Sequence, residues 1–269
     1  MSGDHGERPR GGTGTRAGGR EFPPLPDPLP VPVYDNHTHL DIADPSTGSG
    51  RSGEEPLSAD EQLDRAEAVG VRGVMQVGVD LASSRWGAEL ASWPRVRAIG
   101  ETGLDYFRTE GDDALAAQRR SFEDHIAIAR EYGLALQIHD RDAHADLAPM
   151  LDRVGSPDRV VLHCFSADAE FAQVAAERGW YLSFAGTVTF TNAPRLREAL
   201  RVIPRSRILV ETDAPFLTPT PYRGRPNSAY LVPITVRAMA AELEVDLADF
   251  CQTVAATTER VYGSWDDVA

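Results

Sequence analysis

Two histidines near the start of the chain have the spacing of a metal-binding pair. His37 and His39 lie at the end of a short run of β-branched and apolar residues, with one residue between them. In a β-strand, side chains two positions apart point to the same face, so the imidazoles would lie about 7 Å apart along the chain and could share a cation. The pair therefore indicates a metal site at the end of a strand.

Four more candidate ligands end short apolar runs in the same way: Glu101, His139, His163 and Asp213. Together the six side chains offer more nitrogen and oxygen atoms than one tetrahedral ion can use, so we expect two divalent ions. Mg²⁺, Mn²⁺ and Zn²⁺ all suit this ligand chemistry. All 27 basic residues are arginine, so no lysine can form a Schiff base or, once carbamylated, bridge two ions. A bridging ligand must therefore be a carboxylate.

The elements that position these residues alternate between short apolar runs and helical stretches. Strands are expected near residues 31–35, 71–79, 95–101, 134–139, 159–164, 180–185 and 207–213. Helices are expected near residues 58–70, 112–132, 142–154 and 167–178, with two more between 228 and 262. This alternation predicts an α/β fold, a TIM-type (β/α) barrel. Its closure should be irregular, because the proline-rich stretch 218–227 is unsuited to an eighth central strand.

Length and composition predict the domain organisation. A chain of 269 residues that is 42% hydrophobic can bury one full core, and we expect a single barrel domain over residues 31–269. Residues 1–30, rich in Gly, Arg and Pro, are expected to form a flexible tail, and residues 44–56 a flexible loop beside the site. Cys164 and Cys251 are expected to be free thiols.

Charge and hydrophobicity limit the partners. No apolar run reaches the roughly 20 residues of a membrane span, and the first thirty residues lack the apolar centre of a secretory signal, so we expect a cytoplasmic protein without membrane contact. The net charge of −14 argues against broad adhesion to nucleic acid. It does not exclude nuclease activity, since metal ligands are themselves acidic. No obligate protein partner is evident.

Five motifs, in order along the chain, resemble the signatures of the TatD family of metal-dependent hydrolases. They are DNHTHLD at 35–41, GETGLD at 100–105, IHDRDA at 138–143, LHCFS at 162–166 and ETDAPFL at 211–217. The resemblance extends from residue 34 to about residue 262. It implies a two-metal barrel with phosphodiesterase activity on DNA, commonly a 3′–5′ exonuclease that favours single strands. It also implies that His37, His39 and Asp213 hold one ion, that His139 and His163 hold the other, and that Glu101 bridges them.

The reaction implied is attack by a metal-activated water on phosphorus, because a divalent ion lowers the pKa of bound water to about 7. The expected catalytic residues are Asp213, which could take the proton, Glu101 and Glu211. Glu211 lies two residues before Asp213 on one strand face and is expected to orient a histidine or relay a proton. Substrate contacts are expected from four further residues, three of which would grip phosphate and one of which would stack on a base: Arg141, Arg223, Arg225 and Phe165.

Two alternatives stay open. The same barrel supports hydrolysis of other ester or amide bonds, including D-aminoacyl-tRNA esters and lactones, because an activated water attacks carbon as well as phosphorus. Departures from the family pattern at Ala167 and at residues 228–229 lie in loops that could border the substrate. The second alternative is a non-catalytic scaffold. The complete set of six candidate metal ligands argues against it.

Overall fold

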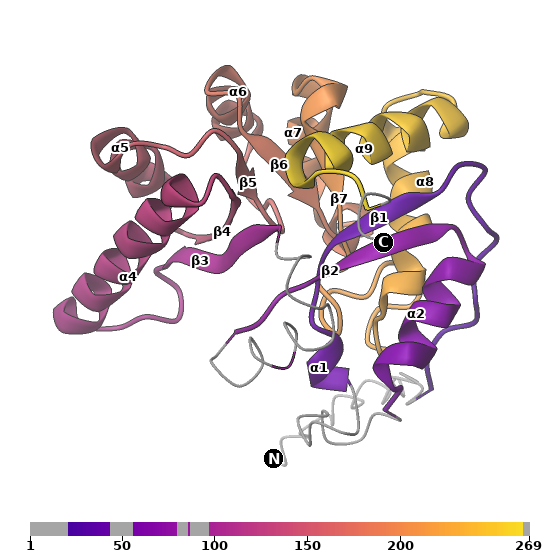
Figure 1. The fold of residues 1–269 in the computed structure, drawn as a ribbon. Helices are drawn as coiled ribbons and strands as arrows, with labels where there is room; N and C mark the ends of the chain where they lie inside the picture. The colour runs from indigo at the N-terminus through magenta and orange to yellow at the C-terminus, as the bar shows by residue number, and fades with distance from the viewer. Residues whose placement is uncertain (1–20, 44–55, 80–85, 87–96, 266–269) are drawn as a thin grey trace, which may run out of the picture.

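The computed structural model describes residues 21–43, 56–79, 86 and 97–265 (Figure 1). The strands among them are β1 (Val33–Thr38), β2 (Val71–Gln76), β3 (Ala98–Asp105), β4 (Ala135–Arg141), β5 (Val160–Leu162), β6 (Tyr181–Phe184) and β7 (Ile208–Val210). The helices are α1 (Leu40–Ala43), α2 (Ala59–Ala68), α4 (Asp112–Glu131), α5 (His144–Val154), α6 (Ala169–Glu177), α7 (Pro194–Val202), α8 (Val232–Glu242) and α9 (Leu247–Tyr262). Short 3-10 turns are η3 (Gly186–Thr189), η4 (Arg205–Arg207) and η5 (Ala229–Leu231).

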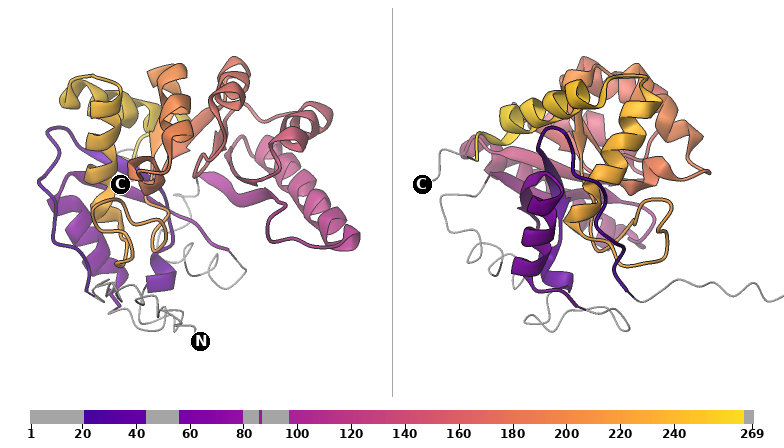
Figure 2. Two further views of the ribbon diagram at one scale, coloured as in Figure 1. Left: turned by 180° about the vertical axis from the view of Figure 1, so that it is seen from behind. Right: turned by 90° about the vertical axis from the view of Figure 1, so that its right-hand side faces the viewer.

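All strand pairs are parallel, in the orders β1-β2 and β3-β4-β5-β6-β7. A parallel bridge between Thr38 and Ala214 joins the end of β1 to the segment after β7. Between β2 and β3 the described residues form no ladder. The helices lie on the outside of the strands in all three views (Figures 1 and 2). The predicted α/β barrel with an irregular closure is therefore confirmed.

Apolar residues of the strands and of the surrounding helices form the main core. Leu136 and Ile138 of β4 pack with Phe122 and Ile126 of α4, and all four are fully buried. The helix spacing of Phe122 and Ile126 places both on one face of α4, toward the sheet. A capping box starts α2, with the Ser58 hydroxyl accepting from the Glu61 amide. No helix in the described part of the chain is long and apolar enough to cross a membrane.

Seven predicted strands and six predicted helices are found, with ends that differ by a few residues. Helix α7 was not predicted. It begins at Pro194, a residue favoured at the first helical position, but Ala193 before it has no side chain that can cap the helix. The residues that it buries, Leu196, Ala199 and Leu200, do have helical spacing.

The segment 21–30 differs from the predicted flexible tail. Arg225 donates from Nε to the Glu21 carbonyl (3.0 Å) and from Nη2 to the Phe22 carbonyl (2.9 Å). The Tyr230 hydroxyl donates to the Pro23 carbonyl (2.5 Å), and Leu29 is buried in the core. The prediction is wrong for this segment, because long-range hydrogen bonds fix its backbone. Residues 1–20 and most of the predicted loop, 44–55, lie outside the described residues.

Gly103 allows β3 to approach β4 beside the candidate ligands. Its φ is +143°, and an added Cβ would lie 2.0 Å from the backbone oxygen of His139. We expect Gly103→Ala to lower the free energy of unfolding by at least about 2 kcal/mol, because β3 would have to move away from β4. Denaturant unfolding monitored by circular dichroism would measure the loss.

Gly133 provides the matched control for this substitution. Its φ is also positive, at +61°, but an added Cβ would meet nothing within 4 Å. Gly133→Ala should therefore cost only the left-handed backbone strain, about 1 kcal/mol. Equal losses at the two positions would contradict the close-approach argument for Gly103.

Candidate metal centre

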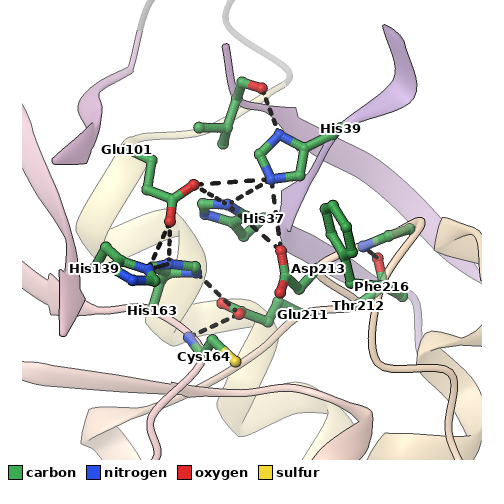
Figure 3. Close-up of polar contacts among 12 residues, drawn as sticks. His37, His39, Glu101, His139, His163, Cys164, Glu211, Thr212, Asp213 and Phe216 are labelled. Atoms are coloured by element: carbon green, nitrogen blue, oxygen red, sulfur yellow. Dashed lines mark hydrogen bonds and ion pairs between the residues drawn. The ribbon is translucent and has the colours of Figure 1, made fainter. Parts of the chain in front are cut away.

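The structure brings the six predicted ligands together at the carboxyl ends of the strands (Figure 3). They come from β1 and the residue after it, from β3, from β4 and from the segments just after β5 and β7: His37, His39, Glu101, His139, His163 and Asp213. In α/β barrels this end of the sheet carries the functional site. Asp213 follows β7 in the left-handed region, with φ of 52°, a backbone conformation that is uncommon outside glycine and is enriched at functional sites.

One group of ligands faces a single oxygen of Glu101. Glu101 Oε1 lies 2.7 Å from His139 Nδ1 and 3.0 Å from His163 Nε2. The two imidazole nitrogens lie 3.4 Å from each other. Two nitrogens and one oxygen thus converge on one point, which is the donor set that a divalent transition metal accepts.

The second group faces the other oxygen of the same carboxylate. Glu101 Oε2 lies 3.8 Å from His37 Nε2 and 3.9 Å from His39 Nε2. Asp213 Oδ1 lies 3.5 Å from His39 Nε2 and 4.0 Å from His37 Nε2. His37, His39 and Asp213 thus form a second group that could hold an ion. Glu101 stands between the two groups and can serve both.

Each of the four imidazoles has an inner nitrogen, which faces Glu101 or Asp213, and an outer nitrogen, which lies within hydrogen-bonding distance of an oxygen atom. The pairs are His37 Nδ1 with Gln137 Oε1 (2.8 Å), His39 Nδ1 with the Val77 carbonyl (2.8 Å), His139 Nε2 with Asp105 Oδ2 (3.2 Å) and His163 Nδ1 with Glu211 Oε1 (3.3 Å). An acceptor at the outer nitrogen holds the ring proton there and leaves the lone pair of the inner nitrogen directed at the centre. All four histidines therefore fit the ligand role that the family resemblance assigns to them.

The charges around the centre favour a cation. Burial would raise the pKa of Glu101, but hydrogen bonds from His139 and His163 hold that pKa well below its usual range. Burial likewise works to lower the pKa of His163, yet Glu101 and Glu211 raise it well above its usual value. The same negative charges would attract a metal ion, and ligation by His163 would release its second proton.

Glu211 is a fully buried carboxylate behind His163. Its Oε1 accepts from the Cys164 amide (2.8 Å) and faces His163 Nδ1. Burial raises the pKa of Glu211. Among the described residues, its Oε2 has no hydrogen-bond partner. This placement fits the predicted role of orienting a histidine.

The predicted phosphate contacts differ in their surroundings. Arg141 follows His139 on β4 by two residues and stacks on the Phe107 ring at 4.1 Å. Arg223 is exposed and stacks on the Phe190 ring at 4.0 Å. Arg225 instead binds the backbone carbonyls of the segment 21–30, so its guanidinium is already engaged.

Phe165 does not have the exposure that its predicted role requires. Its side chain is 3% exposed and packs against Phe171 and Phe184 in the core, so its ring has no face open to a base. The exposed ring near the strand ends is Phe107, 63% exposed, beneath the Arg141 guanidinium. Phe107 is the better candidate for stacking.

Gln137 is a site residue that the sequence prediction missed. It lies two positions before His139 on β4, and the strand period places both side chains on the same face. A glutamine inside an apolar strand was the available signal, because a buried amide needs hydrogen-bond partners. The two cysteines, as predicted, are free thiols, and burial raises the pKa of Cys164 well above its usual value.

A parallel barrel with nitrogen and oxygen ligands gathered at its carboxyl mouth defines the class of metal-dependent barrel hydrolases. The family model described as TatD related DNase matches residues 88–263, and the chain belongs to this family. This match begins after β2 and does not include His37 and His39. The geometry of the structure places these two histidines beside the other candidate ligands.

Relatives of known sequence agree with this assignment, and a solved structure shares the fold. The chain is 37% identical over 266 residues to the uncharacterized metal-dependent hydrolase TatD of Mycobacterium tuberculosis, covering 86% of this chain and 98% of that protein. It is 40% identical over 174 residues to the uncharacterized metal-dependent hydrolase YcfH of Escherichia coli, covering 64% of this chain and 65% of that protein. The fold matches the crystal structure of the TatD homologue YjjV of Escherichia coli with a TM-score of 0.72 at 22% identity, covering 86% and 98% of the two chains.

Proposed function

We propose that this protein is a deoxyribonuclease that hydrolyses phosphodiester bonds with the help of two divalent ions. The observation that carries the proposal is the position of Glu101, whose two carboxylate oxygens face separate ligand groups. The oxygen acceptors at the outer nitrogens of all four imidazoles support it, because they leave the inner nitrogens free to bind a metal ion once any second proton is released. The family description supports DNA as the substrate.

The chain offers a distinct set of residues for each ion. His37, His39 and Asp213 would hold one, His139 and His163 the other, and Glu101 would contact both. Bound Mg²⁺, Mn²⁺ or Zn²⁺ would supply Lewis acidity, lowering the pKa of water and neutralising charge on the phosphoryl oxygens.

Asp213 is the best-placed proton acceptor. Its side chain is 15% exposed, whereas Glu211 is fully enclosed, so only Asp213 of these two can meet a water that enters from solvent. Its Oδ atoms would take the proton of the attacking water. Glu211 would keep the His163 ring oriented through Nδ1.

Arg141 and Arg223 are the proposed phosphate contacts. A guanidinium can grip two phosphate oxygens, and Arg141 also stacks on exposed Phe107, which could receive a base. Local contacts of this kind are needed because the net charge of −14 repels DNA as a whole. Single strands present unpaired bases to such a ring, which supports a preference for single-stranded DNA. The 3′–5′ direction of digestion that we propose rests on the resemblance to the TatD family.

Metal removal tests this function. Protein treated with a chelator should lose at least about 100-fold in hydrolysis of end-labelled single-stranded DNA, because the water would lose its activation. Readdition of Mg²⁺, Mn²⁺ or Zn²⁺ should restore it. With a 5′ label, products should shorten one nucleotide at a time, which a denaturing gel would resolve.

The control is Glu101→Gln protein purified in parallel, whose strongly reduced cleavage would exclude a contaminating nuclease. D-aminoacyl-tRNA and a simple lactone, offered under the same metal conditions, test the alternative esters. Turnover confined to either of these would overturn the nuclease proposal, as would undiminished cleavage without ions.

A further inference from the structure

Gln137 lies inside the barrel behind the metal centre and makes three hydrogen bonds. Its side chain is 1% exposed. Oε1 lies 2.8 Å from His37 Nδ1, while Nε2 donates to the Asn36 carbonyl (2.7 Å) and to the Tyr262 hydroxyl (2.6 Å). Every polar atom of this amide is therefore engaged, which is the condition under which a buried polar group gives a single arrangement.

The Asn36 carbonyl determines which way the amide points. A carbonyl oxygen can only accept, so the NH2 group must face it and Oε1 must face His37. Since Oε1 also can only accept, Nδ1 of His37 must carry the ring proton. Nε2 of His37 is then unprotonated, and this is the atom that lies near Glu101 and Asp213.

His37 differs in this respect from the other three histidines. Their outer nitrogens face a backbone carbonyl or a carboxylate, which are acceptors in either orientation. A carboxamide has a donor and an acceptor on the same group. A reversed amide at Gln137 would donate to Nδ1 and move the ring proton to Nε2, the metal-facing nitrogen.

We propose that Gln137 is a positioning residue that fixes the tautomer of His37, and that the Asn36 carbonyl holds its amide in the required orientation. The consequence for ion binding rests on the proposed function, because the ion between His37, His39 and Asp213 belongs to it. The tautomer itself can be read in the metal-free protein.

The test is ¹⁵N NMR of histidine-labelled, metal-free protein, with the His37 signals assigned from a His37→Asn variant. In the unaltered chain we expect the proton of His37 on Nδ1. In Gln137→Met, which keeps the volume but removes the acceptor, the Nδ1-H form should no longer dominate. Affinity for Co²⁺, measured by competition with a chelator, should fall about 10- to 100-fold at one of two sites.

Gln62→Met is the matched control. Gln62 is another buried amide; its Nε2 donates to the carbonyls of Leu40 and Leu57, and its Oε1 accepts from the Ser228 hydroxyl where Gln137 accepts from His37. It should lose comparable stability while keeping the His37 tautomer and the Co²⁺ affinity. Tyr262→Phe, which leaves the Asn36 bond in place, should also keep the tautomer.

Two results would overturn the proposal. One is an Nε2-H tautomer of His37 in the unaltered protein, a measurement that requires no variant to fold. The other is an unchanged tautomer in folded Gln137→Met. Absence of DNA cleavage would count against the nuclease and leave the tautomer result standing, so the two proposals fail separately.

Discussion

Glu101→Gln should reduce DNA hydrolysis on the order of 10³-fold or more, equivalent to about 4 kcal/mol of activation free energy. Each oxygen of Glu101 faces a different ligand group, with Oε1 2.7 Å from His139 Nδ1 and Oε2 3.8 Å from His37 Nε2. An amide keeps only one oxygen, so one group would face an NH2 donor in place of a ligand. The negative charge between the groups would also be lost. Single-turnover cleavage would measure the rate, and elemental analysis should show bound metal falling from two ions per chain to one or none.

Glu110→Gln is the control for this change, since Glu110 is an exposed carboxylate in the loop after β3. It should keep full activity and both ions. If Glu101→Gln retained two ions and most of its activity, the bridging role of Glu101 would be untenable.

Asp213→Asn should lower kcat on the order of 10²- to 10⁴-fold, the range for loss of a general base. Asparagine keeps an oxygen that can face the ion but cannot take a proton from water. It also tolerates the left-handed backbone of this position, where φ is 52°, so the fold should be unaffected. Metal content should change much less than kcat, and comparing the two separates proton transfer from ligation.

Asp142→Asn is the matched control, because Asp142 is exposed and also has a left-handed backbone, with φ of 58°. We expect no change in kcat. An Asp213→Asn variant with normal kcat at full metal occupancy would show that Asp213 acts as a ligand alone and that the base lies elsewhere.

The grouping of the candidate ligands could be predicted because they follow a simple rule. Each candidate ends an apolar run, and the carboxyl ends of parallel strands meet at one mouth. Glu101 and His163 are far apart in sequence, yet this rule places them together. In the structure Glu101 Oε1 lies 3.0 Å from His163 Nε2. Periodicity assigns a side chain to a face of a strand but does not name its partner. For this reason the Gln137 contact with His37 needed the structure.

Phe165 and Phe107 show where the same rule is insufficient. Both follow strand ends, so the sequence does not distinguish their exposure. The amide of Phe165 donates to the Ser183 carbonyl of β6 (2.9 Å), and its ring is buried in the core. Phe107 has no such tie to a neighbouring strand among the hydrogen bonds described, and its ring is exposed.

The segment 21–30 could not have been placed from composition. Its prolines resemble those of a linker, whereas its position depends on donors about two hundred residues away. Arg237 donates from Nη2 to the carbonyls of Asp27 (2.8 Å) and Pro28 (3.0 Å), in addition to the bonds from Arg225. Long-range contacts of this kind leave no local pattern in the sequence.

Main-chain hydrogen bonds of three candidate ligands contribute to the closure of the barrel between β1 and the segment after β7. The Asp213 amide donates to the His37 carbonyl (2.9 Å), and the His39 amide donates to the Ala214 carbonyl (2.8 Å). Such bonds do not depend on which side chains surround them. The register between His37 and Asp213 should therefore survive extensive substitution of nearby core residues, which makes this junction a fixed reference for redesigning the substrate loops.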